Sequence, residues 1–317
     1  MPLLTTENHF PLIQGPLAGV SCAPFRVLIW KYSNPAFCCT EMISCKTLIH
    51  RPKSSHKRFV YKDPREGRLC FQLSASNPQE LGQATQIATD YGADLIDLNC
   101  GCPVKKIRSK QAGSHLLSEP SKIYQLIRAM KNNTDKPVSI KIRVDAGSDD
   151  RFNEDIVKAV ADAEADFITV HGRNWRDGYD MSCSYRDIQF FVEHLKIPVI
   201  GNGDIACLST LKLMQNTGCA GGMIGRTGVG QPWLIEQLYA ESESLSYSAP
   251  SNVIRGAILI QHIEGLIELM CSEKFALTQA RTFAKYYART LEHKTKFYEA
   301  FNRYDTLDSI RDVITSY

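Results

Sequence analysis

The sequence predicts an α/β protein, a (β/α)8 TIM barrel followed by a small C-terminal helical domain. Through most of the chain, short apolar runs alternate with longer stretches of helical periodicity, which is typical of a parallel sheet with crossover helices. Eight such strand–helix units can be recognised, the number that closes a parallel sheet into a barrel. Beyond residue 252 the periodicity is helical only. A doubly wound open sheet is the competing architecture, because periodicity alone does not separate the two.

The elements follow in order along the chain. Strands are expected at residues 12–17, 36–41, 69–73, 94–98, 138–143, 166–170, 198–201 and 220–224. Helical patterns lie between most of them, for example at residues 79–91, 121–131, 153–163 and 207–216. We therefore place the barrel domain at residues 1–240. Residues 241–252 are Ser-rich and include Pro250, which predicts a linker, and residues 253–317 are expected to form the helical domain.

The composition is that of an ordinary globular protein. Of the 317 residues, 44% are hydrophobic and 22% are charged, with a net charge of +3. Basic residues nevertheless concentrate at residues 46–68 and again at residues 105–110. Such clusters suit a polyanionic partner, although charge runs are commonly solvated surface.

The 11 cysteines show no Cys-x-x-Cys pair, which argues against a zinc ribbon or a thioredoxin-type site. Reduced thiols in a cytoplasmic protein are the simpler account, and we expect no metal. The first ten residues lack the features of a signal peptide. Residues 254–270 are interrupted by charged and polar residues, so we expect an amphipathic helix and no membrane span. We also expect the protein to be monomeric.

The strand ends carry the chemistry, because the functional groups of such barrels lie at the carboxyl ends of the strands. The segment Asn-Cys-Gly-Cys-Pro at residues 99–103 directly follows the mostly apolar run 95–98. A thiol with a pKa of about 8.5 is mostly protonated at neutral pH, so it can donate a proton. Two small buried cysteines beside a turn are the alternative.

Nearly every other strand also ends in a polar group or a glycine. Lys141 alternates with apolar neighbours in a way that directs it into the barrel mouth, as a Schiff-base nucleophile or as a fixed cation. Gly203 and Gly225, with Arg226, suit a phosphate site, although tight turns without a ligand would also use glycine. The remaining candidates at strand ends are Pro16, Leu17, Ala18, Gln72, Arg143, His171, Arg173, Asn202 and Asp204.

In this order, these motifs resemble the bacterial tRNA-dihydrouridine synthases, flavin-dependent reductases of uridine in the tRNA D-loop. The resemblance covers the barrel from about residue 15 to residue 230, and the tail more loosely. Its most specific element is Asn99-x-Gly101-Cys102-Pro103, within the motif Asp97-Leu98-Asn99-x-Gly101-Cys102-Pro103. The other motifs are Pro16-Leu17-Ala18-Gly19, Gln72, Lys141-Ile142-Arg143, His171-Gly172-Arg173, Asn202-Gly203-Asp204 and Ile224-Gly225-Arg226.

The resemblance implies FMN at the barrel mouth and NADPH as the reductant. Pro16, Leu17 and Ala18 would line the isoalloxazine, with Gln72 and Lys141 at its polar edge. Gly203, Gly225 and Arg226 would hold the phosphate. The other residues expected at the cofactor are His171, Asn202 and Asp204.

The resemblance also implies roles at the substrate. Hydride would reach C6 of uracil from the flavin, and Cys102 would supply the proton to C5. Asn99, Arg143 and Arg173 would contact the substrate. Cys100 matches no pattern of the family, so its role stays open.

A stacked uridine must be extruded from tRNA, so the enzyme has to bind a large polyanion around it. Arg281, Lys285 and Arg289 are spaced to form one helical stripe, with Phe283, Tyr287 and Leu291 roughly opposite. We therefore expect a tRNA-binding tail, with Arg281 and Lys285 at the interface. An ordinary surface helix is the alternative.

The chain departs from the family pattern at Arg108, His115, Asp145 and Asn174. These positions leave open which uridine is reduced, and the motifs leave open the B-type or the C-type subfamily. Two other functions remain under consideration. One is a flavin oxidoreductase acting on a small pyrimidine, and the other is a catalytically silent tRNA-binding protein.

Overall fold

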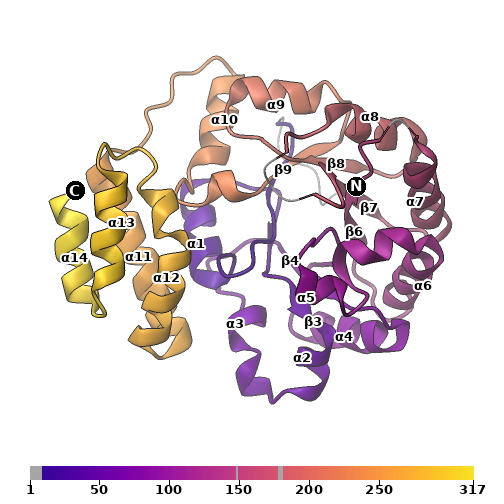
Figure 1. The fold of residues 1–317 in the computed structure, drawn as a ribbon, viewed down its shortest axis with the longest axis horizontal. Helices are drawn as coiled ribbons and strands as arrows, with labels where there is room; N and C mark the ends of the chain where they lie inside the picture. The colour runs from indigo at the N-terminus through magenta and orange to yellow at the C-terminus, as the bar shows by residue number, and fades with distance from the viewer. Residues whose placement is uncertain (1–8, 148, 178–180) are drawn as a thin grey trace.

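In the computed structural model, which describes residues 9–147, 149–177 and 181–317, a parallel barrel is followed by a bundle of C-terminal helices (Figure 1). The strand β1 pairs with both β2 and β9, and β2 also pairs with β4, so the sheet closes on itself. The predicted TIM-barrel fold with a helical tail is confirmed. The strands are β1 Leu12–Gln14, β2 Cys38–Cys39, β3 Ile43–Ser44, β4 Leu69–Ser74, β5 Leu95–Cys100, β6 Val138–Val144, β7 Phe167–Asn174, β8 Val199–Asn202 and β9 Gly221–Ile224.

Helices surround the barrel (Figure 1). The Asn77 side chain caps α4 by accepting a hydrogen bond from the Glu80 N–H, and Ser184 caps α8 in the same way. The α-helices are α1 Ala23–Tyr32, α2 Cys45–His50, α3 Lys57–Val60, α4 Pro78–Asp90, α5 Lys105–Arg108, α6 Pro120–Lys131, α7 Arg151–Asp162, α8 Tyr185–His194, α9 Leu208–Gln215 and α10 Leu234–Ser242. The 3-10 turns are η2 Lys53–Ser55, η3 Gly113–Ser118 and η4 Arg226–Gly228.

Three strands differ from their expected bounds by three or more residues, and one of them is β7, which continues to Asn174. The first strand ends at Gln14, because Pro16 has no N–H to continue the ladder. The second strand is divided into β2 and β3, which both pair with β4. Between them the Thr40 hydroxyl accepts the Gln72 N–H at 3.1 Å, so a side chain takes the place of a backbone partner.

The barrel interior changes from apolar to polar along the strands. An apolar cluster fills its amino-terminal part, with Ile13, Phe37, Cys70, Leu95, Phe167, Ile200 and Met223 among its members. Because alternate residues of a strand share a face, the next inward positions are Gln72, Asp97, Thr169 and Asn202. The apolar layer closes one end, and the polar groups gather at the carboxyl ends.

The tail consists of α11 Asn252–Met270, α12 Glu273–Tyr287, α13 Lys294–Arg303 and α14 Leu307–Ser316. It lies beside α1, on the left of Figure 1. His262 of α11 stacks on Phe283 of α12 with ring centroids 4.1 Å apart, and Phe25 of α1 lies 5.8 Å from the same imidazole. The tail is thus joined to the barrel through a buried aromatic cluster.

The expected stripe of three cations does not lie on one helix. Since α12 ends at Tyr287, Arg289 lies beyond it and donates to the Thr227 and Val229 carbonyls of the barrel. Arg289 therefore contributes to docking of the tail onto the barrel.

Two further findings concern the described ranges only. None of their helices combines the length and the apolar character needed to cross a bilayer. Nor do three or more metal-ligating side chains come together in them.

Candidate active site

A pocket lies at the carboxyl ends of the barrel strands. Its empty space is about 630 Å³, including the part that opens to solvent. The residues that line it come from five strand ends and the loops that follow them. They are Gly15, Pro16, Leu17, Lys141, His171, Arg173, Asn202, Gly203, Asp204, Met223, Gly225, Arg226 and Thr227.

A buried polar network supports this end of the barrel. The Gln72 amide donates to Asp97 Oδ2 at 2.8 Å, and the Ser139 hydroxyl donates to Asp97 Oδ1 at 2.7 Å. Burial raises the pKa of Asp97 to about 6, although both hydrogen bonds and the charge of Lys141 lower it. The network continues to Asn99, whose amide donates to Gln72 Oε1 at 2.7 Å.

The network extends to the loop that carries Cys102. Asn99 Oδ1 accepts the Cys102 N–H at 3.1 Å, so the amide of Asn99 connects Gln72 to the backbone of Cys102. The Cys102 carbonyl in turn accepts the Ser114 N–H at 3.0 Å. The loop is therefore held on both sides of this residue.

The structure separates the two thiols of this segment. Cys100 is the last residue of β5, fully buried in the hydrophobic core, and burial raises its pKa well above the ordinary value. Cys102 follows the strand and is partly exposed. Of the two, only Cys102 is accessible from outside.

Lys141 lines the pocket from β6. Its ammonium donates to Asn202 Oδ1 at 2.6 Å, and the Asn202 amide donates to the Met223 carbonyl at 2.7 Å. Burial lowers the pKa of Lys141 to about 8, although the charge of Asp97 raises it. Lys141 is consequently a cation at neutral pH that loses its charge at a lower pH than an ordinary lysine does.

Next to Lys141, a second polar group is built from His171, Arg173 and Asp204. Arg173 Nη1 donates to His171 Nε2 at 3.0 Å, and Arg173 Nη2 pairs with Asp204. Burial, and after it the charges of the neighbouring cations, lower the pKa of His171 well below its ordinary value. The imidazole is therefore neutral at neutral pH, and its Nε2 accepts a hydrogen bond from Arg173 Nη1.

The two glycines of the expected phosphate site have different surroundings. Gly203 has a φ of +131°, and a Cβ there would lie 2.7 Å from Cys183 Sγ, so the fold itself requires glycine. A Cβ on Gly225 would meet nothing within 4 Å. Packing against other residues therefore does not require a glycine at position 225. The open space beside Gly225 leaves room for a ligand at the start of η4.

Most residues expected at the cofactor line this pocket, but several candidates lie outside its lining. Ala18 is exposed on the loop after β1, and Gln72 is buried in the network. Arg143 is buried, and it donates to the carbonyls of Asn174 and Asp177 at 3.1 and 2.7 Å. The other two are Asn99 and Cys102, placed as described above.

Sequence reasoning gave no role to Asp97 and Ser139, which organise the buried network. The signal for Asp97 was present, because it alternates with Leu95 and Asn99 along β5 and must face the barrel interior. Ser139 is set two residues before Lys141 in β6 and shares its face.

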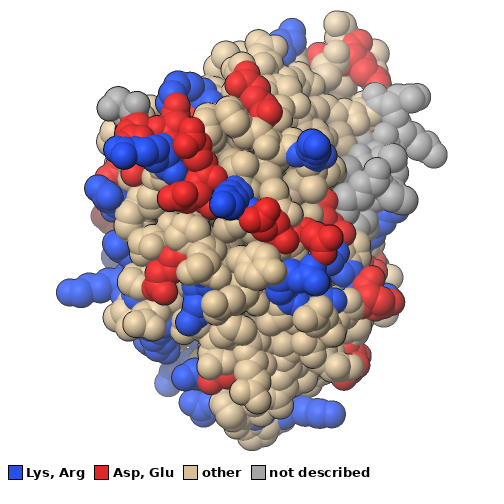
Figure 2. All heavy atoms as spheres, turned by 90° about the vertical axis from the view of Figure 1, so that its right-hand side faces the viewer, with Lys and Arg blue, Asp and Glu red and all other residues tan. Residues whose placement is uncertain are grey.

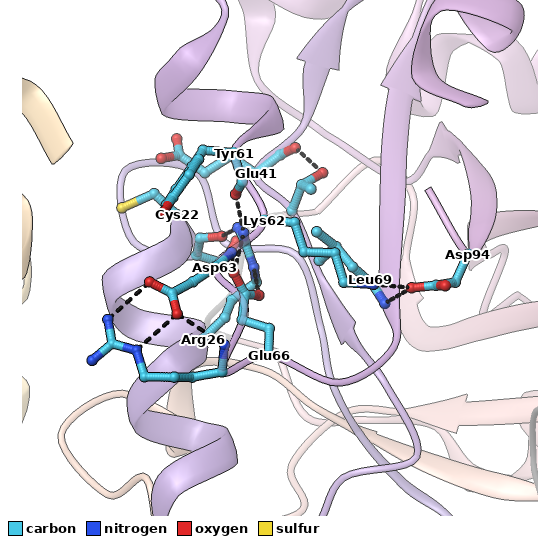
Figure 3. A network of polar contacts seen from close by, with 12 residues as sticks. Cys22, Arg26, Glu41, Tyr61, Lys62, Asp63, Glu66, Leu69 and Asp94 are labelled. Atoms are coloured by element: carbon cyan, nitrogen blue, oxygen red, sulfur yellow. Dashed lines mark hydrogen bonds and ion pairs between the residues drawn. The ribbon is translucent and has the colours of Figure 1, made fainter. Parts of the chain in front are cut away.

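The basic segment 46–68 is partly neutralised by acids from elsewhere in the chain. Arg58 pairs with Glu41, and Lys62 pairs with Asp94 at 2.6 Å. Figure 3 shows the Lys62 ammonium and the Leu69 N–H converging on the Asp94 carboxylate. The same close-up shows Arg26 of α1 bound to Glu66, a pair whose side chains are fully buried. Glu41 and Asp94 thus offset two positive charges of this segment, whereas Arg26 takes up one of the segment's own acids, Glu66.

The face over α6–α8 carries both signs of charge in close alternation (Figure 2). Lys131 pairs with Asp166 at 2.8 Å, and Arg186 pairs with Asp150 at 2.8 Å. A face of this kind offers a polyanion no field of one sign. On the tail, Lys285 is exposed, whereas Arg281 is bound to Asp305 at 2.6 Å.

Comparisons with known proteins agree with the geometry. A model of the family described as Dihydrouridine synthase (Dus) matches residues 13–315. A tRNA-dihydrouridine synthase B of Vibrio parahaemolyticus is 32% identical over 297 residues, which cover 93% of this chain and 91% of that protein. The tRNA-dihydrouridine synthase B of Vibrio cholerae is 30% identical over 96% of this chain and 95% of its own length. That of Escherichia coli K12 is 29% identical over the same shares of the two chains.

Proposed function

The chain belongs to the dihydrouridine synthase family, a family of oxidoreductases, and on this premise we propose that it reduces a D-loop uridine of tRNA to 5,6-dihydrouridine with bound FMN and NADPH. The observation that carries the proposal is that a cation, an open glycine site and an accessible thiol all lie at the carboxyl ends of the barrel strands. The cation Lys141 and the open site at Gly225 line its pocket. Cys102, whose thiol is accessible, is joined to the buried polar network through its backbone N–H.

The residues present fit FMN. Pro16 and Leu17 offer an apolar wall to the ring system, with Ala18 beside them. Lys141 provides a positive charge at its polar edge and is held by Asn202, and we propose that Gln72 lies at the same edge. Arg226 and the space at Gly225 suit the phosphate, and Gly203, Asp204 and the neutral His171 line the same pocket. When bound, FMN would take a hydride from NADPH and pass it to C6 of the uracil.

The protein's own residues would complete the reduction. Hydride addition at C6 leaves negative charge at C5 and its neighbouring carbonyl, and Cys102 donates the proton that C5 needs. The Asn99 amide holds the Cys102 backbone, and we propose that Asn99 also contacts the base. Arg173 lines the pocket, which supports its proposed role at the base, and we propose that Arg143 orders the loop at Asn174 and Asp177.

A tRNA substrate requires contacts outside the pocket, because the uridine has to leave its stack. We propose that residues 253–317 form a tRNA-binding domain, that Arg281 and Lys285 contribute to its interface, and that the monomeric protein acts in the cytoplasm. Lys285 supports this role by its exposure.

Absorption spectroscopy tests the proposal. The purified protein should bind FMN, be bleached by NADPH and be re-oxidised by tRNA that lacks dihydrouridine. Protein that takes up no FMN would contradict the proposal and favour a silent tRNA-binding protein. Re-oxidation by a free pyrimidine but not by tRNA would favour the small-molecule oxidoreductase.

The phosphate assignment predicts an effect of Gly225→Ala. The added methyl group meets no protein atom within 4 Å, so it should lower the melting temperature of the apoprotein less than Gly203→Ala does. FMN affinity should fall about tenfold or more, because a hydrogen bond to a charged group contributes about 1.5–3 kcal/mol. Fluorescence titration measures the affinity. Gly203→Ala serves as the contrast, since its Cβ clashes with Cys183 and should lower the melting temperature itself. Unchanged FMN affinity in Gly225→Ala would remove this assignment.

The tail assignment predicts an effect of Lys285→Glu. Affinity for tRNA should fall, and the slope of log K against log salt should decrease by about 1 if one phosphate contact is lost. Lys158→Glu is the matched control, because it changes the net charge by the same amount as Lys285→Glu. Lys158 is exposed on α7, which lies on the opposite side of the barrel from the tail (Figure 1). Filter binding at several salt concentrations measures both. Equal effects of the two substitutions would exclude a local contact at Lys285.

A further inference from the structure

We infer that the helical tail helps to position the wall of the cofactor pocket, because Gln279 of α12 and Glu41 of the barrel together hold the carbonyl and the N–H of Gly19, in the loop that carries Pro16 and Leu17. Both side chains would be positioning residues for the loop that follows β1. The inference rests on the proposed function only in assigning FMN to this loop. The contacts themselves belong to the protein alone.

The loop after β1 connects the pocket to the first barrel helix. Pro16 and Leu17 line the pocket, and the chain then turns so that the Leu17 carbonyl accepts the N–H groups of Val20 and Ser21 at 3.0 and 2.9 Å. The Ser21 hydroxyl accepts the Leu17 N–H at 2.9 Å. Gly19 lies at the outer end of this turn, so groups that bind Gly19 fix the position of Pro16 and Leu17.

Glu41 holds the N–H of Gly19 from the barrel side. Its Oε2 accepts that N–H at 2.8 Å, and the residue is only 4% exposed. A buried carboxylate needs a partner, and Arg58 of α3 donates to both of its oxygens at 3.0 and 3.1 Å. Arg58, a residue of the basic segment 46–68, therefore stabilises the Glu41 carboxylate that binds Gly19.

Gln279 holds the carbonyl of Gly19 from the tail side. Its Nε2 donates to that oxygen at 3.0 Å and also lies 3.6 Å from Cys22 Sγ. The residue is 8% exposed, which is unusual for a glutamine on a surface helix. Thr282 of the same helix lies 3.9 Å from the position that a Cβ of Gly19 would take. Helix α12 therefore covers Gly19 directly.

The two contacts have a common consequence. Gly19 is fixed by a barrel carboxylate on one side and by a tail amide on the other, and each partner is itself buried. Loss of either partner would leave a backbone group of the loop without its protein hydrogen bond. The loop would then sample other positions, and the apolar wall at Pro16 and Leu17 would be less well defined for a planar ligand.

The test compares Gln279→Leu with Gln261→Leu. Both substitutions replace a glutamine of the tail by leucine, and each removes one side-chain hydrogen bond between the tail and the barrel. Gln261 of α11 accepts from Lys31 of α1 at 2.9 Å, away from the loop. Hydrogen–deuterium exchange in the protein without FMN should be roughly fivefold faster for residues 16–21 in Gln279→Leu and unchanged in Gln261→Leu. FMN affinity should fall by a similar factor in Gln279→Leu alone.

Equal exchange of residues 16–21 in the two variants and the wild type would overturn the inference. Glu41→Leu provides a second, independent variant should Gln279→Leu fail to fold, because it removes the acceptor of the Gly19 N–H, and it should accelerate exchange in the same residues. A change in melting temperature without faster local exchange would also overturn it, because it would show a merely structural role. The exchange experiment needs no FMN, so failure of the wild type to bind FMN would contradict the proposed function and leave this measurement decisive.

Discussion

Cys102→Ala is expected to bind FMN and to be bleached by NADPH, and to form dihydrouridine about 10²–10⁴-fold more slowly than the wild type. The reason is that the thiol supplies only the proton at C5. The half-reaction between NADPH and FMN does not involve that proton. Single-turnover kinetics with pre-reduced enzyme and tRNA measures the second half-reaction separately.

Cys100→Ala is the matched control for this prediction. Its thiol is fully buried in the hydrophobic core, so its loss should lower the melting temperature and leave tRNA reduction near the wild-type rate. A defect in tRNA reduction confined to Cys100→Ala would show that the proton comes from the other sulfur. Equal rates for Cys102→Ala and the wild type would exclude Cys102 as the proton donor.

Lys141→Met is expected to lose about 10²–10³-fold in the rate of flavin reduction by NADPH, the usual cost of removing one group that stabilises developing charge. The ammonium is held in the pocket by Asn202, and methionine has a similar length without the charge. Stopped-flow measurement of bleaching gives the rate. Lys141→Arg keeps the charge and should keep most of the rate.

The same residue predicts a pH dependence. The pKa of Lys141 is lowered to about 8, so in the wild type the rate of bleaching should fall as the pH rises through about 8. In Lys141→Met this decline should be absent. Folding responds with the opposite sign. Between pH 8 and pH 10.5 the folded state binds fewer protons at this site than the unfolded state, so this residue makes stability rise with pH there. Lys141→Met should accordingly have a higher melting temperature than the wild type at pH 7.

The order of the strands and the identity of the residues at their ends could be predicted from the sequence, because both depend on local patterns. The alternation in 138–143 directed Lys141 inward, and the structure places it in the pocket. The end of β1 at Gln14 also follows from a local signal, because Pro16 cannot continue the ladder of hydrogen bonds. The expected strand nevertheless extends to residue 17. Local patterns fix elements better than their ends.

The contacts that support the site could not be predicted, because they join residues far apart in the chain. Glu41 and Gln279 meet at Gly19 from opposite directions, and no spacing in the sequence relates them. Arg289 was assigned to a stripe with Arg281 by helical spacing, but the helix ends first. The two thiols at 100 and 102 were equivalent by spacing, and only the end of β5 separates a buried one from an accessible one.

The most direct test of the proposed reaction is the product itself. Wild-type protein is incubated with FMN, NADPH and an unmodified tRNA transcript, which is then digested and analysed by mass spectrometry. The account predicts that one uridine-containing D-loop fragment gains the mass of two hydrogen atoms, and that Cys102→Ala forms this fragment far more slowly than the wild type. A transcript of unchanged mass after the bound flavin has been reduced by NADPH would contradict it.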